Sequence, residues 1–183
     1  MRSTKLRTLT QCAILLAMST VLSGIKIIEL PFEGSVTLLS MLPVCMVGLL
    51  HGPRWGIGTA LLYSVIQLMA SKCFAWGLTP GVLIVCILAD YLVPFTSRGV
   101  TGFFRGRGRA GIIAAIALAL GLRMVCHYIS GVTIWREMAP EGWDYRLYSL
   151  VYNGIYMVPE TIFTMIGAVI LSGIPQIRKM LSQ

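Results

Sequence analysis

The chain has 183 residues, of which 56% are hydrophobic and only 12% are charged, and its mean hydropathy is +0.80. Soluble domains carry about 25% charged residues, so this composition excludes a soluble globular protein and indicates an integral membrane protein. The formal net charge of +8 must then be arranged around apolar segments, and its distribution predicts their orientation.

Six apolar runs predict six membrane-spanning helices in a single domain that covers residues 1–183. They lie at residues 8–28, 36–50, 54–70, 80–97, 110–130 and 148–172. The second run is short for a full crossing, which takes about 20 residues, and a Gly-Pro turn follows it at residues 52–53. We therefore expect an all-α membrane protein with six transmembrane helices.

Basic residues are unevenly divided between the two sides of this arrangement. With the N-terminus inside, ten lie on the cytoplasmic side: Arg2, Lys5, Arg7, Arg54, Arg98, Arg105, Arg107, Arg109, Arg178 and Lys179. Four lie outside: Lys26, Lys72, Arg136 and Arg146. The positive-inside rule then predicts that both termini are cytoplasmic. The Arg-Gly repeat at 105–109 fits this topology together with attraction to anionic lipid, so we expect no nucleic-acid partner.

Four ionisable residues interrupt the apolar runs: Asp90, Arg123, His127 and Glu160. A charge at membrane depth costs at least about 2.5–3.5 kcal/mol, and such residues usually line a functional cavity. At about 1.5 Å per residue, Asp90 lies ~15 Å and Glu160 ~18 Å below the outer ends of their helices. All four residues fall in the outer half or near the midplane, so we expect one pocket that opens outward.

Helical spacing adds aromatic and amide groups to this pocket. Arg123 and His127 are four residues apart and share one helix face. The predicted lining also includes Tyr91, Trp135, Asn153 and the four-residue series Tyr148, Tyr152, Tyr156 and Glu160. Such a lining suits a flat heteroaromatic ligand with a positive charge. Two structural alternatives remain: an ion pair between Arg123 and Glu160, and a helix-to-helix hydrogen bond by Asn153.

Catalytic and metal-binding signatures do not occur in the sequence. The five cysteines stand singly, without CxxC or Cys/His ligand spacing. The hydrolase patterns HExxH and GxSxG and the phosphate loop GxxxxGK[ST] are absent. We therefore expect no enzyme, no resident metal and no cofactor.

Three separated motifs carry a family resemblance. They are Asp90-Tyr91-Leu92-Val93-Pro94, then His127-Tyr128-Ile129-Ser130-Gly131 followed by Trp135, and Gly142-Trp143 ahead of Tyr148-Ser149-Leu150 and Asn153-Gly154. In this order the chain resembles, over nearly its whole length, the thiamine-specific S components of energy-coupling factor (ECF) vitamin transporters. The resemblance implies a protein of the prokaryotic plasma membrane. It also implies that six residues bind thiamine: Asp90, Tyr91, His127, Trp135, Tyr148 and Asn153.

The same resemblance implies how the protein works with partners. In this family the S component captures the vitamin, and a transmembrane coupling (T) subunit with two ATPase subunits supplies the energy. Ala13 and Ala17 form a small-xxx-small pair in the first span. The family uses such a surface to dock on the coupling subunit, although packing within the monomer would need the same spacing.

Departures from the family bear on the substrate. Asp replaces the usual Glu at position 90, the first outer loop lacks an expected Trp for which Phe32 or Glu33 could substitute, and Tyr63 occupies an expected aromatic site. The segment 72–79, with Trp76 as a further wall, is longer than in the family and is expected to close as a lid together with the first outer loop. Another vitamin or a thiamine precursor therefore stays open as the ligand. Proton-coupled transport by this chain alone, with Asp90 and Glu160 as relays, is the weaker alternative.

Overall fold

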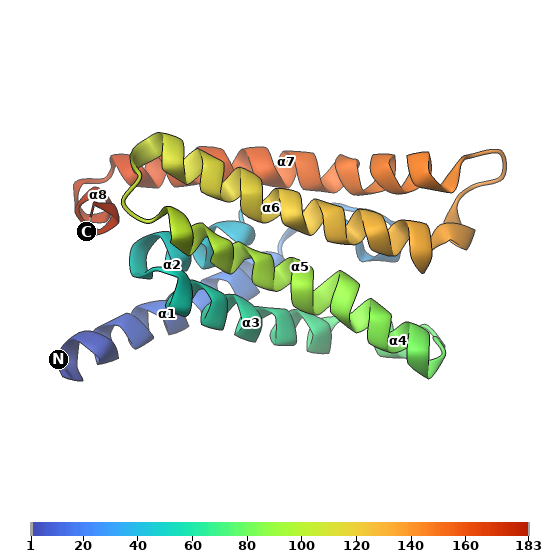
Figure 1. Cartoon of the computed structure of the whole chain (residues 1–183), viewed down its shortest axis with the longest axis horizontal. Coiled ribbons are helices and arrows are strands. Elements are labelled where there is room, and N and C mark those ends of the chain that lie inside the picture. The colour runs from blue at the N-terminus through green and yellow to red at the C-terminus, as the bar shows by residue number, and fades with distance from the viewer. Residues whose placement is uncertain (1, 183) are drawn as a thin grey trace.

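The computed structural model describes residues 2–182 as a bundle of helices with one small hairpin (Figure 1). In chain order the elements are α1 (Arg2–Ser23), β1 (Lys26–Glu29), η1 (Pro31–Glu33), β2 (Ser35–Thr37), α2 (Met41–His51), α3 (Pro53–Ala70), η2 (Cys73–Ala75), α4 (Pro80–Cys86), η3 (Ile87–Leu92), α5 (Val93–Thr96), η4 (Ser97–Phe104), α6 (Gly108–Thr133), η5 (Arg136–Met138), α7 (Tyr145–Gly173) and α8 (Pro175–Leu181).

Five helical segments within residues 2–182 are long and apolar enough to cross a membrane. They are Thr4–Ser23, Pro53–Ala75, Pro80–Phe104, Gly108–Thr133 and Tyr145–Gly173. The second predicted span, at residues 36–50, corresponds to the shorter helix α2, in which residues 41–50 are all buried. A helix that is apolar on every side belongs in a protein core. Accordingly, α2 packs against α1, α3, η4 and α7 rather than facing lipid.

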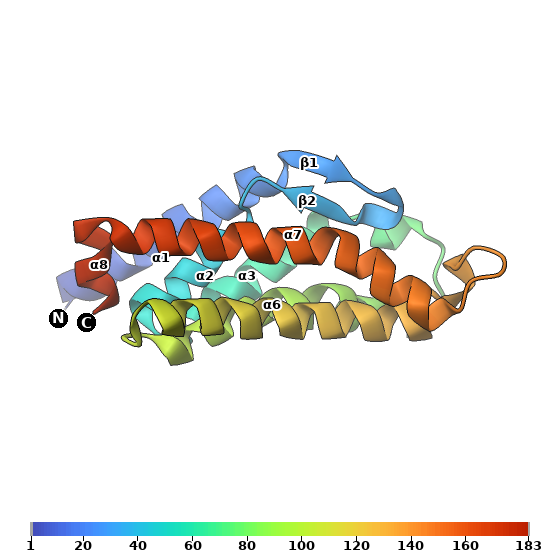
Figure 2. The ribbon, with the colours of Figure 1, turned by 90° about the horizontal axis from the view of Figure 1, so that it is seen from above.

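An antiparallel hairpin replaces parts of the first two predicted spans. The prediction continued the first span to residue 28 and began the second at residue 36, but α1 ends at Ser23 and α2 begins at Met41. Between them β1 pairs with β2, and the hairpin lies beside α7 (Figure 2). Ile27, Ile28 and Val36 are apolar, so they fit the pattern of a membrane helix, but they are also β-branched, and β-branched residues favour strands. The all-α prediction is therefore wrong for this segment.

Both described ends of the chain lie at the same end of the bundle (Figure 1). One basic residue assigned to the cytoplasmic side lies elsewhere, because the fourth helical segment extends to Phe104 and Arg98 is buried within it. Arg98 thus does not contribute to the loop charge. The side chain of Arg2 lies outside the described residues.

Helices α6 and α7 form a close pair along the bundle, as Figures 1 and 2 show. They approach near Gly131, where an added Cβ would overlap the Ser149 hydroxyl and lie 2.9 Å from Ser149 Cβ. Ser149 in turn donates a 3.1 Å hydrogen bond from its hydroxyl to the Tyr128 carbonyl. This glycine lets the two helices that carry His127 and Asn153 come together at the site.

Candidate functional site

A cavity of about 720 Å³ lies between the hairpin and the helices. Its volume is within the range of sites that enclose small organic ligands. All nine residues predicted to bind substrate line it: Tyr63, Asp90, Tyr91, Arg123, His127, Trp135, Tyr148, Asn153 and Glu160. Side chains that are up to 97 positions apart in the sequence therefore share one enclosure.

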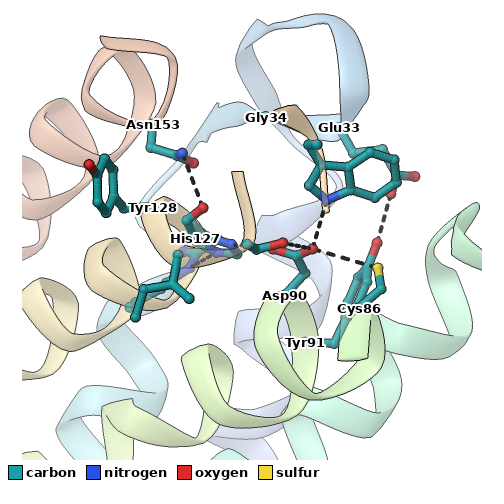
Figure 3. Close-up of polar contacts among 12 residues, drawn as sticks. Glu33, Gly34, Cys86, Asp90, Tyr91, His127, Tyr128 and Asn153 are labelled. Carbon is teal, nitrogen blue, oxygen red and sulfur yellow. Dashed lines mark hydrogen bonds and ion pairs between the residues drawn. The ribbon is translucent and has the colours of Figure 1, made fainter. Parts of the chain in front are cut away.

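Asp90 is the centre of the polar contacts in this cavity (Figure 3). It lies in η3, a π-helical turn, which Pro94 favours because it has no N–H to donate to the Asp90 carbonyl. Its Oδ2 accepts hydrogen bonds from Ser130 Oγ at 2.6 Å and from Trp135 Nε1 at 3.0 Å. The carboxylate is thus held in a fixed orientation by donors from α6 and the loop after it.

His127 connects Asp90 to Arg123. Its Nδ1 lies 3.1 Å from Asp90 Oδ1, and its Nε2 lies 3.2 Å from Arg123 Nε. Because an arginine Nε–H can only donate, Nε2 must accept, and the ring proton is on Nδ1, where it donates to Asp90. The imidazole is neutral in this arrangement. It links the Arg123 guanidinium to the Asp90 carboxylate, and these two groups do not contact each other directly.

Glu160 and Arg123 do not form the ion pair that the sequence allowed. Among the side chains of residues 4–182, no Lys or Arg nitrogen lies within 4.0 Å of Glu160. Its Oε1 instead accepts hydrogen bonds from both the backbone N–H and the hydroxyl of Thr37, each at 2.5 Å. Glu160 is fully buried, and it ties α7 to the base of the hairpin.

Asn153 makes the helix-to-helix contact that the sequence left open. Its Nδ2 donates to the Ser149 carbonyl at 2.9 Å and to the His127 carbonyl on α6 at 3.4 Å. Its Oδ1 accepts from Tyr156 Oη at 2.6 Å. The amide therefore borders the cavity while it holds α7 against the backbone of His127.

The tip of the hairpin closes over the cavity through Glu33. Glu33 Oε2 accepts from Tyr91 Oη at 3.0 Å, and Oε1 accepts from the backbone N–H of Lys72 at 3.0 Å. Tyr152 adds a second attachment, because its hydroxyl donates to the Pro31 carbonyl and accepts from the Gly34 N–H. The first outer loop and the segment after α3 thus meet at one carboxylate.

Aromatic rings form a large part of the remaining wall. Trp76 packs edge-to-face on Trp135, with centroids 5.0 Å apart, and Tyr91 is nearly parallel to Phe95 at 6.3 Å. Both Trp76 and Phe32 line the cavity. Rings of this kind offer faces for stacking a flat ligand and for cation–π contact.

Sequence reasoning missed several lining or supporting residues, among them Ser130, Phe95 and Arg98. Ser130 is a direct partner of Asp90, and it could have been found because it lies three residues after His127 on the same helix face. Phe95 and Arg98 both line the cavity. Phe95 lies inside the predicted fourth span but was not assigned to the lining, and Arg98 was missed because that span was ended at residue 97.

Ala13 and Ala17 lie outside the cavity and are both exposed on α1. Packing within the monomer therefore does not explain their spacing. Among residues 2–182, no group of three His, Cys, Asp or Glu side chains is placed to hold a metal ion.

Known proteins share sequence with this chain over most of its length. Residues 9–179 match the model of the thiamine transporter protein family (Thia_YuaJ). The chain is 30% identical over 175 residues to the thiamine transporter ThiT of Bacillus subtilis (strain 168), with 88% of each chain covered.

Solved structures show the same architecture. ThiT from Listeria monocytogenes superposes with a TM-score of 0.77 at 25% identity, covering 97% of this chain and 98% of that one. An S component for biotin from an ECF-type ABC transporter has a TM-score of 0.62 at 18% identity, with 100% and 95% covered, and this likeness concerns the fold alone. The chain is a multi-pass protein of the cell membrane, and it belongs to the thiamine transporter protein family.

Proposed function

We propose that this chain is the thiamine-binding S component of an ECF-type importer, which captures thiamine in an outward-opening cavity and passes it to an ATP-driven coupling module. Family membership over residues 9–179 supports the substrate, and the ECF S component for biotin shares the fold. The observation that carries the binding mode is the fixed Asp90 carboxylate in an aromatic-walled cavity.

Thiamine combines a positively charged thiazolium ring with an aminopyrimidine. The thiazolium would lie near Asp90 and stack on Trp135, while His127, Asn153 and Tyr148 would border the pyrimidine edge. Aspartate reaches one methylene less far than glutamate, and here Ser130 and Trp135 hold it back. The cation therefore approaches the carboxylate from the open side of the cavity, where Glu33 supplies a second negative charge.

Energy coupling would use the exposed face of α1. Ala13 and Ala17 leave a shallow strip on that helix, and small residues let a second helix approach closely in a membrane. A transmembrane coupling subunit with two ATPase subunits would dock there. The single domain of residues 1–183 would then act as the substrate-binding part of the complex.

Ligand binding to the purified protein tests the proposal. Native mass spectrometry should detect one bound thiamine, and titration should quench tryptophan fluorescence in a saturable way. The pyrimidine precursor lacks the positive ring and should bind at least about tenfold more weakly, which corresponds to a loss of ~1.4 kcal/mol. Equal affinity for the precursor, or no binding of thiamine, contradicts the substrate assignment.

Uptake into proteoliposomes tests the need for partners. Thiamine should accumulate only when the coupling subunit, the ATPases and ATP are present. Accumulation by this chain alone, driven by a proton gradient, would instead support the proton-coupled alternative.

A further inference from the structure

Arg98 is the largest fully buried side chain in the described part of the molecule, at 1% exposure. It borders the cavity eight residues beyond Asp90, about 12 Å deeper along the helix. Its Nε and Nη1 atoms are buried and have no hydrogen-bond partner. A guanidinium carries five N–H donors and a permanent positive charge, so leaving it unpartnered in a membrane protein is costly.

Two aromatic rings surround the Arg98 charge but cannot accept its N–H groups in the plane of the guanidinium. The guanidinium carbon lies 4.8 Å from the Tyr63 centroid and 4.6 Å from the Phe95 centroid. Cation–π contacts are worth up to about 2 kcal/mol when desolvated. This is less than the several kcal/mol that burial of a charge costs, so the rings offset only part of the penalty.

No protein carboxylate neutralises this charge at contact distance. Among residues 2–182, no Asp or Glu oxygen lies within 4.0 Å of Arg98 or of Arg123. Glu160 directs its Oε1 to Thr37 and keeps its Oε2 buried without a hydrogen-bond partner, while Asp90 is held by Ser130 and Trp135.

Arg123 adds a second positive charge beside the same Phe95 ring. Its guanidinium carbon also lies 4.6 Å from the Phe95 centroid, so the two guanidinium groups are separated by no more than twice that distance. Its side-chain partners are His127 Nε2 and Met41 Sδ, both of which are neutral. The floor of the cavity therefore concentrates positive charge.

We propose that the floor of the cavity binds a small inorganic anion of the size of chloride, held by the N–H groups of Arg98 and attracted by Arg123. A planar fork of unpartnered donors is the arrangement that arginine offers to anions. The site is separate from the thiamine contacts around Asp90, and it exists whether or not the vitamin is bound. Such an anion would also offset the positive charge that thiamine brings into the cavity above it.

Thermal stability of the wild-type protein in detergent tests the site without thiamine. At constant ionic strength, replacing gluconate with chloride or bromide should raise the Tm saturably by about 2–4 °C, because an anion that binds the folded state stabilises it. An unchanged Tm overturns the proposal and would mean that Glu160 balances Arg98 from a distance.

Two variants locate the effect. Arg98→Gln should abolish the dependence of Tm on chloride, whereas Arg136→Gln, at an exposed arginine near the outer end of α6, should keep it. A chloride effect that persists in Arg98→Gln overturns the assignment to this residue. If Arg98→Gln fails to fold, crystals of the wild type grown in bromide decide: an anomalous peak beside the Arg98 guanidinium supports the site, and its absence there refutes it.

Discussion

The Tyr91 hydroxyl donates a 3.0 Å hydrogen bond to Glu33 across 58 positions of sequence. Tyr91 follows Asp90 in η3, so the bond joins the tip of the hairpin to the turn that presents the carboxylate. Glu33 and its neighbour Phe32 both have positive φ angles, of 69° and 63°. Non-glycine residues pay a cost of about 1–3 kcal/mol for such a backbone, so the contacts of the tip hold it in a strained closed form.

Removing the charge of Glu33 should speed the release of thiamine. In Glu33→Gln, the amide oxygen can still accept from the Lys72 N–H and the amide nitrogen can donate to the Tyr91 hydroxyl, but two charge-assisted hydrogen bonds become weaker neutral ones. A net loss of about 1 kcal/mol corresponds to a roughly fivefold faster dissociation rate. Stopped-flow tryptophan fluorescence measures it, with the exposed Glu137→Gln as the control. Unchanged dissociation would show that the tip does not retain the ligand.

Asp90→Asn should weaken thiamine binding at least about tenfold. The asparagine amide has no negative charge. Its NH2 group would face either Ser130 and Trp135 or His127, the residues that donate hydrogen bonds to the wild-type carboxylate. Hydrogen bonds to charged groups contribute about 1.5–3 kcal/mol each. Isothermal titration calorimetry gives the affinity, and Glu141→Gln at an exposed acid serves as the matched variant. Wild-type affinity in Asp90→Asn would rule out this carboxylate as the counter-charge.

The close approach of α6 and α7 can be tested by adding one methyl group. Gly131→Ala should destabilise the protein by about 1–3 kcal/mol, because the new Cβ meets Ser149 from a neighbouring helix. Gly121→Ala, on the same helix with nothing within 4 Å of an added Cβ, should leave the Tm unchanged or raise it. Equal Tm values for both variants would show that the helices can separate at no cost.

Bulky residues on the exposed strip of α1 should separate binding from transport. The double substitution of Ala13 and Ala17 by Leu should leave thiamine affinity in detergent unchanged and should abolish ATP-driven uptake. The corresponding change at Ala114 and Ala117, two exposed alanines of α6, should preserve both activities. Full uptake by the α1 variant would place the docking surface elsewhere.

The sequence was sufficient to predict five membrane helices and nine of the residues that line the cavity. Long apolar runs mark lipid-facing helices, and a rare polar residue inside such a run has few places to go except an internal cavity. This is why Asp90, His127 and Glu160 could be grouped although they lie on different helices. The hairpin at residues 26–37 was not predictable in the same way. It is held in place by tertiary contacts with Tyr152 and Glu160 of α7, which no local sequence pattern shows.

Arg98 shows where charge patterning fails. An arginine after Thr96-Ser97 at the end of an apolar run normally marks the cytoplasmic interface. Here the helix continues as η4 to Phe104, because Gly99 lets it lie against the backbone of α3; an added Cβ would be 2.5 Å from Ile57 Cα. That contact involves two distant segments, and no local pattern in the sequence reports it.

The π-helical turn at Ile87–Leu92 sets the angular phase of the whole fourth segment. A residue in an α-helix advances the chain by about 100° around the axis, so one residue gained or lost in this turn would rotate everything after it relative to everything before it. Phe95 and Arg98 would then turn away from the floor while Cys86 stayed in place. Length changes at this turn therefore reach across the membrane, and a deletion there would change which side chains face lipid and which line the cavity.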